Sequence, residues 1–385
     1  MNVHAKGPLV AQDFENVSLV HVVRQYTPMV GGLEDFVRQL VSHQKGRFGS
    51  LKVVTLDRLF IQPDETLPAK DTVDGVEVLR IPYRGSTRYP VAPGVFAKIR
   101  DADLVHVHAI DFFFDALAWT RPFHRRRLVA TTHGGFFHTD AFQGVKKLWL
   151  NGVTRLSASQ YRAIACCSDN DLEMFRSIAP SRVRLIENGV NLEKFEGAAA
   201  VEPRKRIVTI GRFSKNKRLE RLLDVLQKLR SSDAEWCLEI IGGPSDLSVE
   251  DLEGLIAARG LQEGATVHAR IPDEKVRDVL STCSFFASAS EYEGFGIAMI
   301  EGLSAGLIPV VEPNVAFQGL ARKHELVHLT DFTDPKGAAD TLLQAWSELE
   351  ARPAMRMDAI ASARQHSWQT TIRQYDTLYR EALDI

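Results

Sequence analysis

Two glutamates separated by seven residues are the most informative pair of side chains in this 385-residue sequence. Glu293 precedes a segment that we expect to be a helix beginning near Gly296, and Glu301 lies within it. The two oxygens of a carboxylate can accept hydrogen bonds from neighbouring sugar hydroxyls, so one glutamate suits a ribose and the other a hexose. Between them, the amides of Phe295, Gly296 and Ile297 would form a helix N-terminus that attracts an anion such as a diphosphate.

Cationic side chains and a glycine pair could complete such an anion site. Arg212 and Lys217 follow the apolar run RIVTIG on a loop before a helix, and they offer a guanidinium and an ammonium at one strand end. Taken alone, this loop is equally well explained as a solvated basic turn, because Lys215 and Arg218 also lie in it. Gly31 and Gly32 follow another apolar run and open a helix, where unhindered amides can approach an anion. Together these groups suit a sugar nucleotide.

The elements that must position these groups repeat in a regular order along the chain. Short apolar runs alternate with segments of helical period, which indicates parallel α/β sheets. The stretch EGAAAVEPRKR near the midpoint reads as a linker. We therefore expect two doubly wound Rossmann-like domains facing a central cleft, over residues 1–200 and 201–366, and a closing C-terminal helix over 367–385 that could return to the first domain.

Composition and termini narrow the class of protein. Lys and Arg number 47 against 49 Asp and Glu, so the chain lacks the basic excess of a nucleic-acid-binding protein. The four cysteines have no zinc-ligand or disulfide-framework spacing, which favours a reducing compartment. The N-terminus resembles no export signal, and no apolar stretch is long enough to span a bilayer. We expect a cytoplasmic protein without nucleic-acid partners.

Three short motifs match sequence patterns of other enzyme classes. His324 and His328 fit the H-E-x-x-H pattern of zinc peptidases, with Glu348 as a candidate third ligand, but Pro335 and two Asp soon follow and oppose a sustained helix. Residues 302–306 fit the G-x-S-x-G pattern of hydrolases. That motif needs a strand before it and a helix after it, whereas here a helical segment precedes it and a strand follows. The loop after RIVTIG resembles a P-loop, except that Asn216 replaces its second glycine. A zinc peptidase remains a remote alternative, and we assign no metal.

The stretch from Glu293 to Glu301, E-G-F-G-I-A-M-I-E, resembles the E-x7-E motif of retaining glycosyltransferases of the GT-B fold, family 4. The motifs GGLE, THGG, ENGV and GRFSKNK occur in the order typical of that family, and the resemblance covers nearly the whole chain. The stretches VVRQYTPMVGGLE, YRGSTRYPVAP and VHAIDFFFDALA look particularly like the α-mannosyltransferases of xanthan and acetan assembly. That resemblance implies GDP-mannose as donor and a polyprenyl-diphosphate-linked cellobiose as acceptor, in exopolysaccharide assembly.

The resemblance also implies roles for single residues. Arg212 and Lys217 would bind the diphosphate, Glu301 the ribose, and Glu293 with the amides after it the donor sugar. His133 of the THGG motif would lie beside the reacting centre. The remaining positions implied are Gly31 and Gly32 closing over the phosphates from the other domain, and Ile271 and Asp273 near the base.

The implied reaction retains the anomeric configuration and requires no cofactor or metal, because two cations and a helix terminus supply the positive field. We expect a same-face route through an oxocarbenium-like transition state, with Glu293 holding a hydroxyl rather than attacking C1. UDP-glucose or UDP-N-acetylglucosamine as donor, or another acceptor, are alternatives with the same chemistry. A two-domain sugar-binding protein without catalysis is a further alternative.

A lipid-linked acceptor predicts a surface that meets a membrane. From Arg121 to Arg162 there are eight Lys or Arg against one Asp, interleaved with large apolar residues. Such a mixture suits an anionic leaflet, so we expect peripheral association with the inner face of the plasma membrane. A solvated basic face, with some of the aromatic residues lining the acceptor cleft, is the competing interpretation. The large apolar residues in question are Phe123, Phe136, Phe137, Phe142, Leu148, Trp149 and Leu150.

Overall fold

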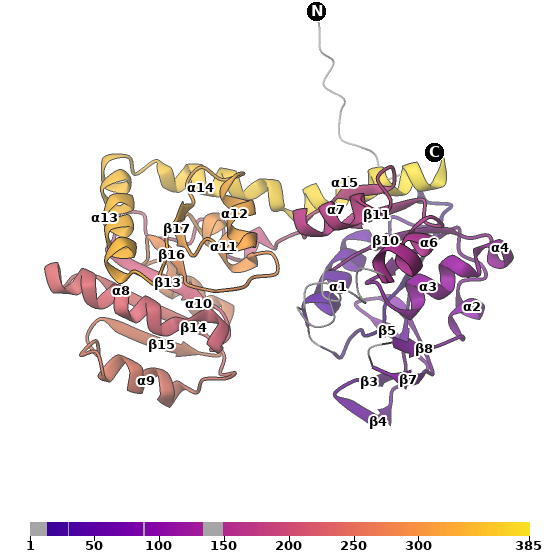
Figure 1. Cartoon of the computed structure of the whole chain (residues 1–385), viewed down its shortest axis with the longest axis horizontal. Coiled ribbons are helices and arrows are strands. Elements are labelled where there is room, and N and C mark those ends of the chain that lie inside the picture. Colours follow the sequence, from indigo (N-terminus) through magenta and orange to yellow (C-terminus); the bar gives the residue numbers. More distant parts are fainter. Residues whose placement is uncertain (1–13, 30, 88, 134–148) are drawn as a thin grey trace, which may run out of the picture. The chain divides into compact units, whose positions relative to one another are not determined.

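The structure is a computed structural model that describes residues 14–29, 31–87, 89–133 and 149–385. It separates into two compact α/β units (Figure 1). The first unit comprises Met1–Gly189 and Trp368–Ile385, and the second comprises Val190–Ser367. Most of the predicted site residues lie in the second unit, whereas His133 and the glycine pair lie in the first.

An eight-stranded sheet forms the centre of the first unit, in the order β12-β11-β10-β9-β1-β2-β6-β5. Its strands are parallel except for the edge strand β5, which runs antiparallel to β6. Two short hairpins, β3-β4 and β7-β8, lie outside this sheet. The strands are β1 (Ser18–Val22), β2 (Ser50–Leu56), β3 (Arg58–Leu59), β4 (Gln62–Thr66), β5 (Lys70–Val73), β6 (Val76–Ile81), β7 (Arg84–Ser86), β8 (Tyr89–Val91), β9 (Leu104–His108), β10 (Arg127–Thr131), β11 (Ala163–Cys166) and β12 (Val183–Leu185).

Helices cover both faces of this sheet. Neighbouring residues of one strand belong to different apolar clusters: Leu19 packs with α1 and α15, whereas Val20 packs with α3, α6 and α7. This burial on both sides explains why the central strands are continuous apolar runs in the sequence. The helices are α1 (Gly32–Gln44), α2 (Val95–Lys98), α3 (Phe112–Trp119), α4 (Arg121–His124), a π-helical turn (Leu150–Thr154), α6 (Arg155–Ala158), α7 (Asp169–Arg176) and α15 (Trp368–Leu383).

The second unit is built on a parallel six-stranded sheet in the order β15-β14-β13-β16-β17-β18. Its chain order departs from its spatial order beside β13, so the loops after β13 and β16 leave the same edge of the sheet side by side. The elements are β13 (Arg206–Ile210), α8 (Leu219–Ser232), β14 (Cys237–Gly242), α9 (Val249–Ala257), β15 (Ala265–Ala269), α10 (Asp273–Leu280), β16 (Phe285–Ser288), α11 (Ile297–Ala305), β17 (Ile308–Val311), α12 (Val315–Ala321), β18 (His328–Leu329), α13 (Pro335–Ala351) and α14 (Met355–Ala363).

The boundary between the units lies at Val190, earlier than the expected position after residue 200. Residues 190–200 are not a linker, because Leu192, Phe195 and Ala199 are buried in the apolar core of the second unit. The amide of Ala199 also donates to the carbonyl of Ala305 in α11. Small residues in this stretch therefore permit close packing where composition alone suggested a flexible connection.

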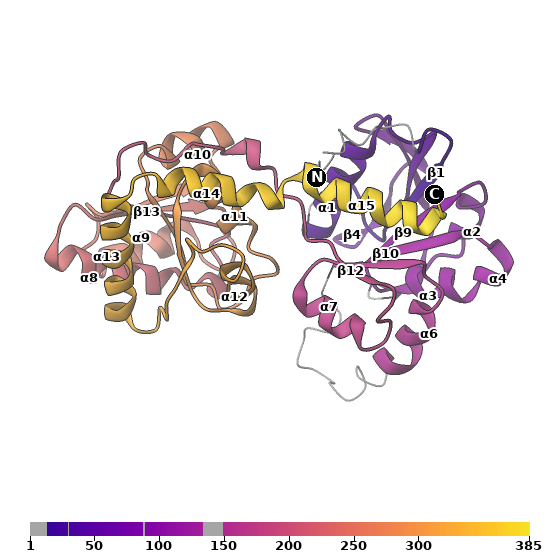
Figure 2. The same ribbon diagram turned by 90° about the horizontal axis from the view of Figure 1, so that it is seen from above.

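The C-terminal helix α15 belongs to the first unit, where it lies beside α1 and across β9, β10 and β11 (Figure 2). Tyr375 and Tyr379 are fully buried in the core that this helix shares with the sheet. The ring of Trp368 lies on Gly189, where a Cβ atom would come within 2.5 Å of it. The chain thus crosses between the units twice, at residues 189–190 and 367–368.

The H-E-x-x-H segment does not form the helix that a zinc peptidase requires. Helix α12 ends at Ala321, His324 lies in the following turn, and His328 opens β18. The ring of His324 is buried and hydrogen bonded, with its Nε2 2.8 Å from Nε2 of His366. Two histidines on different elements cannot present both rings from one helical face, so the zinc peptidase hypothesis is wrong.

Candidate active site

The structure brings two of the predicted site residues into direct contact in the second unit. Lys217 lies on the loop between β13 and α8, and Glu293 lies on the loop between β16 and α11. The Nζ atom of Lys217 donates to Oε1 of Glu293 over 2.6 Å. Only 21% and 16% of these side chains are exposed, so the ion pair is shielded from most of the solvent.

Neighbouring contacts hold these two loops together. The side-chain amide of Asn216 donates to the carbonyl of Tyr292 over 2.8 Å and accepts from its amide over 3.1 Å. Glu291 accepts from Arg218 over 2.8 Å and from Arg221 over 2.9 Å. Sequence analysis identified Asn216 only as a departure from a P-loop. Its role could not be found from spacing, because its partner lies on a loop 76 residues away.

The N-terminus of α11 is free of the side chains that usually occupy such a position. Helix α11 begins at Ile297 with no side-chain cap and no acidic residue in its first turn. Gly296 has φ +91°, and a Cβ atom there would lie 3.0 Å from Phe317 and Leu320, so a larger residue would be strained and crowded. Phe295 is half-buried against the ring of His366. The helix amides and dipole can therefore serve an anion beside Lys217.

The remaining predicted residues of this unit lie on α11, on the loop after β13 and after β15. Glu301 is half-buried on α11, and Arg212 is exposed with no ion-pair partner among the described residues. Ile271 and Asp273 follow β15, the edge strand two positions from β13. Asp273 pairs with Lys194 over 3.0 Å, with 65% of its side chain exposed. Their assignment to the base stays a prediction.

In the first unit, the glycine pair lies where the sequence predicted, at the start of α1. Gly31 is the N-cap, and the carboxylate of Glu34 lies close over it, so that a Cβ atom at Gly31 would collide with that side chain. Gly32 instead has open space around its Cα. A carboxylate this close to the helix terminus repels a phosphate, so phosphate binding here would need Glu34 to turn away.

His133 lies just beyond β10, with a left-handed backbone of φ +57°. Its Nε2 lies 3.1 Å from Nδ1 of His108. The rings of His133 and Phe36 pack in a T-shaped arrangement with their centroids 4.8 Å apart. Burial lowers the pKa of His133 to about 3, a shift that Asp171 opposes and Arg24 reinforces. A non-glycine residue held in this backbone region is typical of functional positions. Gly134 and Gly135 of the THGG motif lie outside the described residues.

Three further histidines are buried beneath His133, and sequence analysis did not identify them. His21 on β1 and His106 and His108 on β9 have nitrogen atoms within 4.8 Å of one another. Such a group could hold a metal ion, but all six of their ring nitrogens have hydrogen-bond partners in the protein. Burial lowers the pKa of all three, to about 4 for His21. The spacing of two between His106 and His108 on an apolar strand was the available signal for that pair.

An acid close to His133 was also missed. The hydroxyl of Thr132 donates to Asp171 over 2.5 Å, and Sγ of Cys167 lies 3.2 Å from the same carboxylate. Asp171 is buried in the first turn of α7, which begins at the N-cap Ser168. The carboxylate is therefore held next to the backbone that carries His133. Sequence spacing alone could not reveal this contact, because Thr132 and Asp171 are on separate elements.

Two family descriptions match the two halves of the chain. Residues 30–194 match Glycosyltransferase Family 4, and residues 191–366 match Glycosyl transferases group 1. The two matches meet where the structure changes from one unit to the other.

Three similar proteins carry one and the same name, GDP-mannose:cellobiosyl-diphosphopolyprenol alpha-mannosyltransferase. The protein of Komagataeibacter xylinus is 38% identical over 96% of this chain and 94% of its own length. That of Xanthomonas oryzae pv. oryzae is 40% identical over 96% and 98%, and that of Xanthomonas campestris is 39% identical over 95% and 97%.

Solved structures with this arrangement of elements are more distant in sequence. A glycosyltransferase from Rickettsia africae superposes with a TM-score of 0.71 at 17% identity, over 96% of this chain and 99% of that one. An Anabaena protein in complex with UDP superposes with a TM-score of 0.72 at 16% identity, over 94% and 99%. The likeness confirms the expected fold, two Rossmann-like units of the GT-B type.

Proposed function

Because the chain belongs to the family 4 glycosyltransferases, we propose that it transfers mannose from GDP-mannose, as an α-linked residue, to a polyprenyl-diphosphate-linked cellobiose. The observation that carries this proposal is the similarity, at 38–40% identity and nearly full length, to three proteins named for that reaction. The predicted place of the reaction is exopolysaccharide assembly. Other donors, UDP-glucose or UDP-N-acetylglucosamine, are the alternatives that the experiment below must exclude.

In the proposed reaction the second unit holds the donor. Lys217, Arg212 and the amides at the start of α11 take the diphosphate, and Glu301 takes the ribose hydroxyls. Glu293 takes hydroxyls of the mannose, which suits a carboxylate already placed 2.6 Å from the Lys217 ammonium. As the bond from C1 to the phosphate oxygen lengthens, negative charge grows on the diphosphate, and these preorganised cations and amides stabilise it.

The acceptor hydroxyl then attacks C1 from the face that the diphosphate leaves, through an oxocarbenium-like transition state. Its proton passes to the leaving phosphate oxygen, so neither a separate base nor a covalent enzyme intermediate is required. We propose that the reaction retains the anomeric configuration and uses no metal, because the two side-chain cations and the helix terminus supply the positive field.

A donor screen with a polyprenyl-diphosphate-linked cellobiose acceptor tests this assignment. We expect product with GDP-mannose and at least tenfold less with UDP-glucose or UDP-N-acetylglucosamine, with chelators causing no loss. Arg212→Ala and Glu293→Ala should abolish transfer, whereas Glu291→Gln on the same loop should retain it. Preference for a UDP sugar, or full activity of either alanine variant, would contradict the proposed donor or the proposed site.

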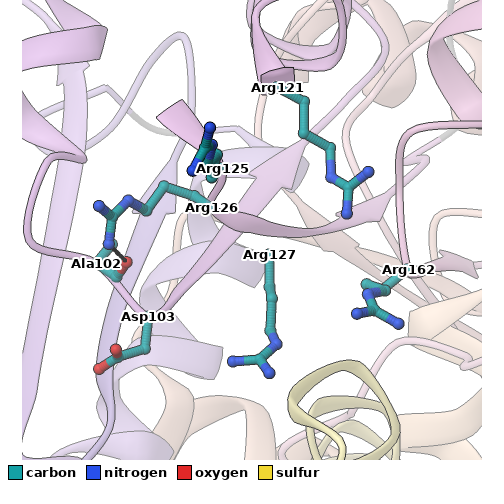
Figure 3. Close-up of a pocket in the computed structure, with 7 residues that line it drawn as sticks. All are labelled: Ala102, Asp103, Arg121, Arg125, Arg126, Arg127 and Arg162. Atoms are coloured by element: carbon teal, nitrogen blue, oxygen red, sulfur yellow. Dashed lines mark hydrogen bonds between the residues drawn. The ribbon is translucent and has the colours of Figure 1, made fainter. Parts of the chain in front are cut away.

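We further propose that the first unit meets the cytoplasmic face of the membrane through a basic surface. No helix in the described ranges is both long and apolar enough to cross a bilayer. A pocket of about 360 Å³ opens at the amino ends of β9, β10 and β11, and Figure 3 shows arginine side chains arranged around it. Its lining consists of Ala102, Asp103, Arg121, Arg125, Arg126, Arg127 and Arg162.

Arg121 and Arg125 are the strongest candidates among these arginines for binding a lipid phosphate. Arg127 and Arg162 pair with Asp384, over 3.4 and 3.3 Å, whereas Arg121 and Arg125 have no acidic partner among the described residues. Phe123, which lies between them on α4, is 86% exposed and could enter the headgroup region. Each cation near an anionic surface contributes about 1 kcal/mol. Phe136, Phe137, Phe142 and Leu148 of the expected surface lie outside the described residues.

Sedimentation with liposomes tests the membrane contact. Binding to vesicles containing phosphatidylglycerol should fall severalfold in the double variant Arg121→Ala and Arg125→Ala, and it should weaken with salt. Lys336→Ala, an exposed cation of the second unit, is the matched control and should bind normally. Equal binding by the double variant, or no binding of the parent protein at low salt, would remove this proposal without affecting the donor assignment.

A further inference from the structure

A chain of hydrogen bonds runs through the core of the first unit and ends on His133. Gln44 of α1 is the first member, with its Oε1 2.8 Å from Nε2 of His21. Nδ1 of His21 lies 2.9 Å from Nε2 of His108, and Nδ1 of His108 lies 3.1 Å from Nε2 of His133. Gln44, His21 and His108 are completely buried or nearly so, and they come from α1, β1 and β9.

The orientation of the Gln44 side-chain amide decides which atoms donate and which accept along this chain. The Nε2 group of Gln44 donates to the hydroxyl of Tyr379 in α15, over 3.0 Å, so its Oε1 is the atom that faces His21. A carbonyl oxygen only accepts, and His21 must therefore carry its hydrogen on Nε2.

A neutral imidazole carries one N–H hydrogen, so a ring that donates from Nε2 must accept at Nδ1. The same assignment therefore repeats from one histidine to the next. Nδ1 of His21 accepts from Nε2 of His108, and Nδ1 of His108 accepts from Nε2 of His133. Nε2 of His133 therefore carries the hydrogen and donates it to Nδ1 of His108. Nδ1 of His133 is the ring nitrogen through which it can contact a substrate, and that atom carries a lone pair.

The rings must be neutral for this argument, and their surroundings keep them so. A protonated His21 or His108 would donate from both nitrogens and set two N–H groups against each other within the chain, whereas a proton added to His133 would occupy Nδ1 and remove the acceptor. Burial lowers the pKa of His21 and His133 to about 4 and about 3, and it lowers that of His108 well below its ordinary value. The charged groups that bear on His133 are Asp171, which favours its protonation, and Arg24, which opposes it.

We propose that Gln44, His21 and His108 are positioning residues that hold His133 as its Nε2–H tautomer, so that Nδ1 accepts a hydrogen bond from a substrate hydroxyl. This inference rests on the proposed function in one respect, namely that His133 faces the reacting sugars. It assigns His133 the part of a hydrogen-bond acceptor and excludes the part of a proton donor. The left-handed backbone at Ala109 (φ +75°), directly after His108, and at His133 (φ +57°) shows how tightly these strand ends are held.

The tautomer can be measured without any substrate. In protein labelled with ¹⁵N-histidine, long-range proton–nitrogen correlation spectra distinguish protonated from unprotonated ring nitrogens. We expect His21, His108 and His133 all as neutral Nε2–H tautomers at pH 7.5, assigned through single replacements. An Nδ1–H tautomer at His133, a charged ring in the chain, or a stoichiometric metal ion bound to the rings would overturn the proposal. This result is independent of which sugar the enzyme transfers.

Kinetics of three variants separate positioning from general loss of packing. His108→Phe breaks the chain and should lower kcat for the best donor about tenfold, with little change in KM, and should mix the tautomers of His133. His106→Phe is the matched control, because His106 lies on the same strand, is equally buried and bonds to Tyr379 and Thr131 rather than to His133. It should retain kcat within about twofold.

His108→Asn is the rescue variant. Its carboxamide oxygen takes the place of Nδ1 and can accept from His133, so we expect both the Nε2–H signal and most of kcat to return. Equal losses of kcat in the phenylalanine variants, or no recovery with asparagine in a folded protein, would show that the chain does not set His133. If no donor supports transfer at all, the spectra still decide the tautomer, so failure of the proposed function and failure of this inference remain distinguishable.

Discussion

Neutralising Glu293 should strengthen binding of GDP while it weakens sugar transfer. Without ligand, the ammonium of Lys217 donates to the Glu293 carboxylate over 2.6 Å, so a diphosphate that recruits Lys217 must compete with Glu293. In Glu293→Gln the neutral amide holds Lys217 less strongly, and the cation becomes available to the phosphates. GDP carries no mannose and loses nothing from the change of residue 293.

The size of the effect follows from the contact. A hydrogen bond between charged groups contributes about 1.5–3 kcal/mol. The two side chains retain 21% and 16% exposure, and the amide still accepts weakly, so we take the low end, about 1.5 kcal/mol. This corresponds to about tenfold tighter GDP binding. Transfer of mannose should fall at least a hundredfold, because glutamine offers one uncharged acceptor oxygen where the carboxylate offers two charged ones.

Isothermal titration with GDP and initial-rate kinetics with GDP-mannose measure the two quantities. Glu291→Gln is the control, because Glu291 lies two residues away, is half-exposed and pairs with Arg218 and Arg221 instead of Lys217. It should leave both GDP affinity and turnover within about twofold. Unchanged or weaker GDP binding by Glu293→Gln would refute the competition between Glu293 and the diphosphate for Lys217.

Three further outcomes concern the stability of the units. Gly189→Ala should lower the free energy of unfolding by about 1–3 kcal/mol in urea titrations, because its Cβ would overlap the ring of Trp368, whereas Gly254→Ala, in a helix with open space, should not destabilise. Deletion of α15 should leave the first unit insoluble or unable to unfold cooperatively, because the deletion uncovers the core that holds Tyr375 and Tyr379. Burial lowers the pKa of His324 to about 4 and of His366 to about 3, from 6.5, so the unfolded chain binds protons first as the pH falls below about 6.5. Unfolding free energy measured from pH 7.5 to 4.5 should therefore decrease, and by less in a folded His366→Asn variant.

The order of the elements, and the position of the proposed donor residues on loops and a helix start that follow strands, could be predicted from the sequence. Strands buried on both faces produce continuous apolar runs, and a helix that must start at an anion leaves a glycine and uncapped amides, as at Gly296. These are local requirements, written in consecutive residues. Glu293 and Glu301 were found for the same reason, since one loop and one helix carry both.

The boundary between the units and the surroundings of His133 could not be predicted in this way. Residues 190–200 have the composition of a linker, yet Phe195 is packed in the second unit, and only the neighbouring elements decide that. Likewise, nothing in the spacing of Gln44, His21 and His108 indicates that their side chains meet, because they come from separate elements.

The sequence by itself therefore determined the class of fold and the family, and it predicted which residues would meet a nucleotide sugar, because each of these is encoded over short spans. Only the tertiary structure decided that Lys217 is paired with Glu293 before a ligand arrives, and that α15 joins the first unit. It also decided which nitrogen of His133 is already engaged. The physical reason is that pairing and tautomer depend on which atoms lie within about 3 Å of one another, and chain folding sets those distances between residues far apart in sequence.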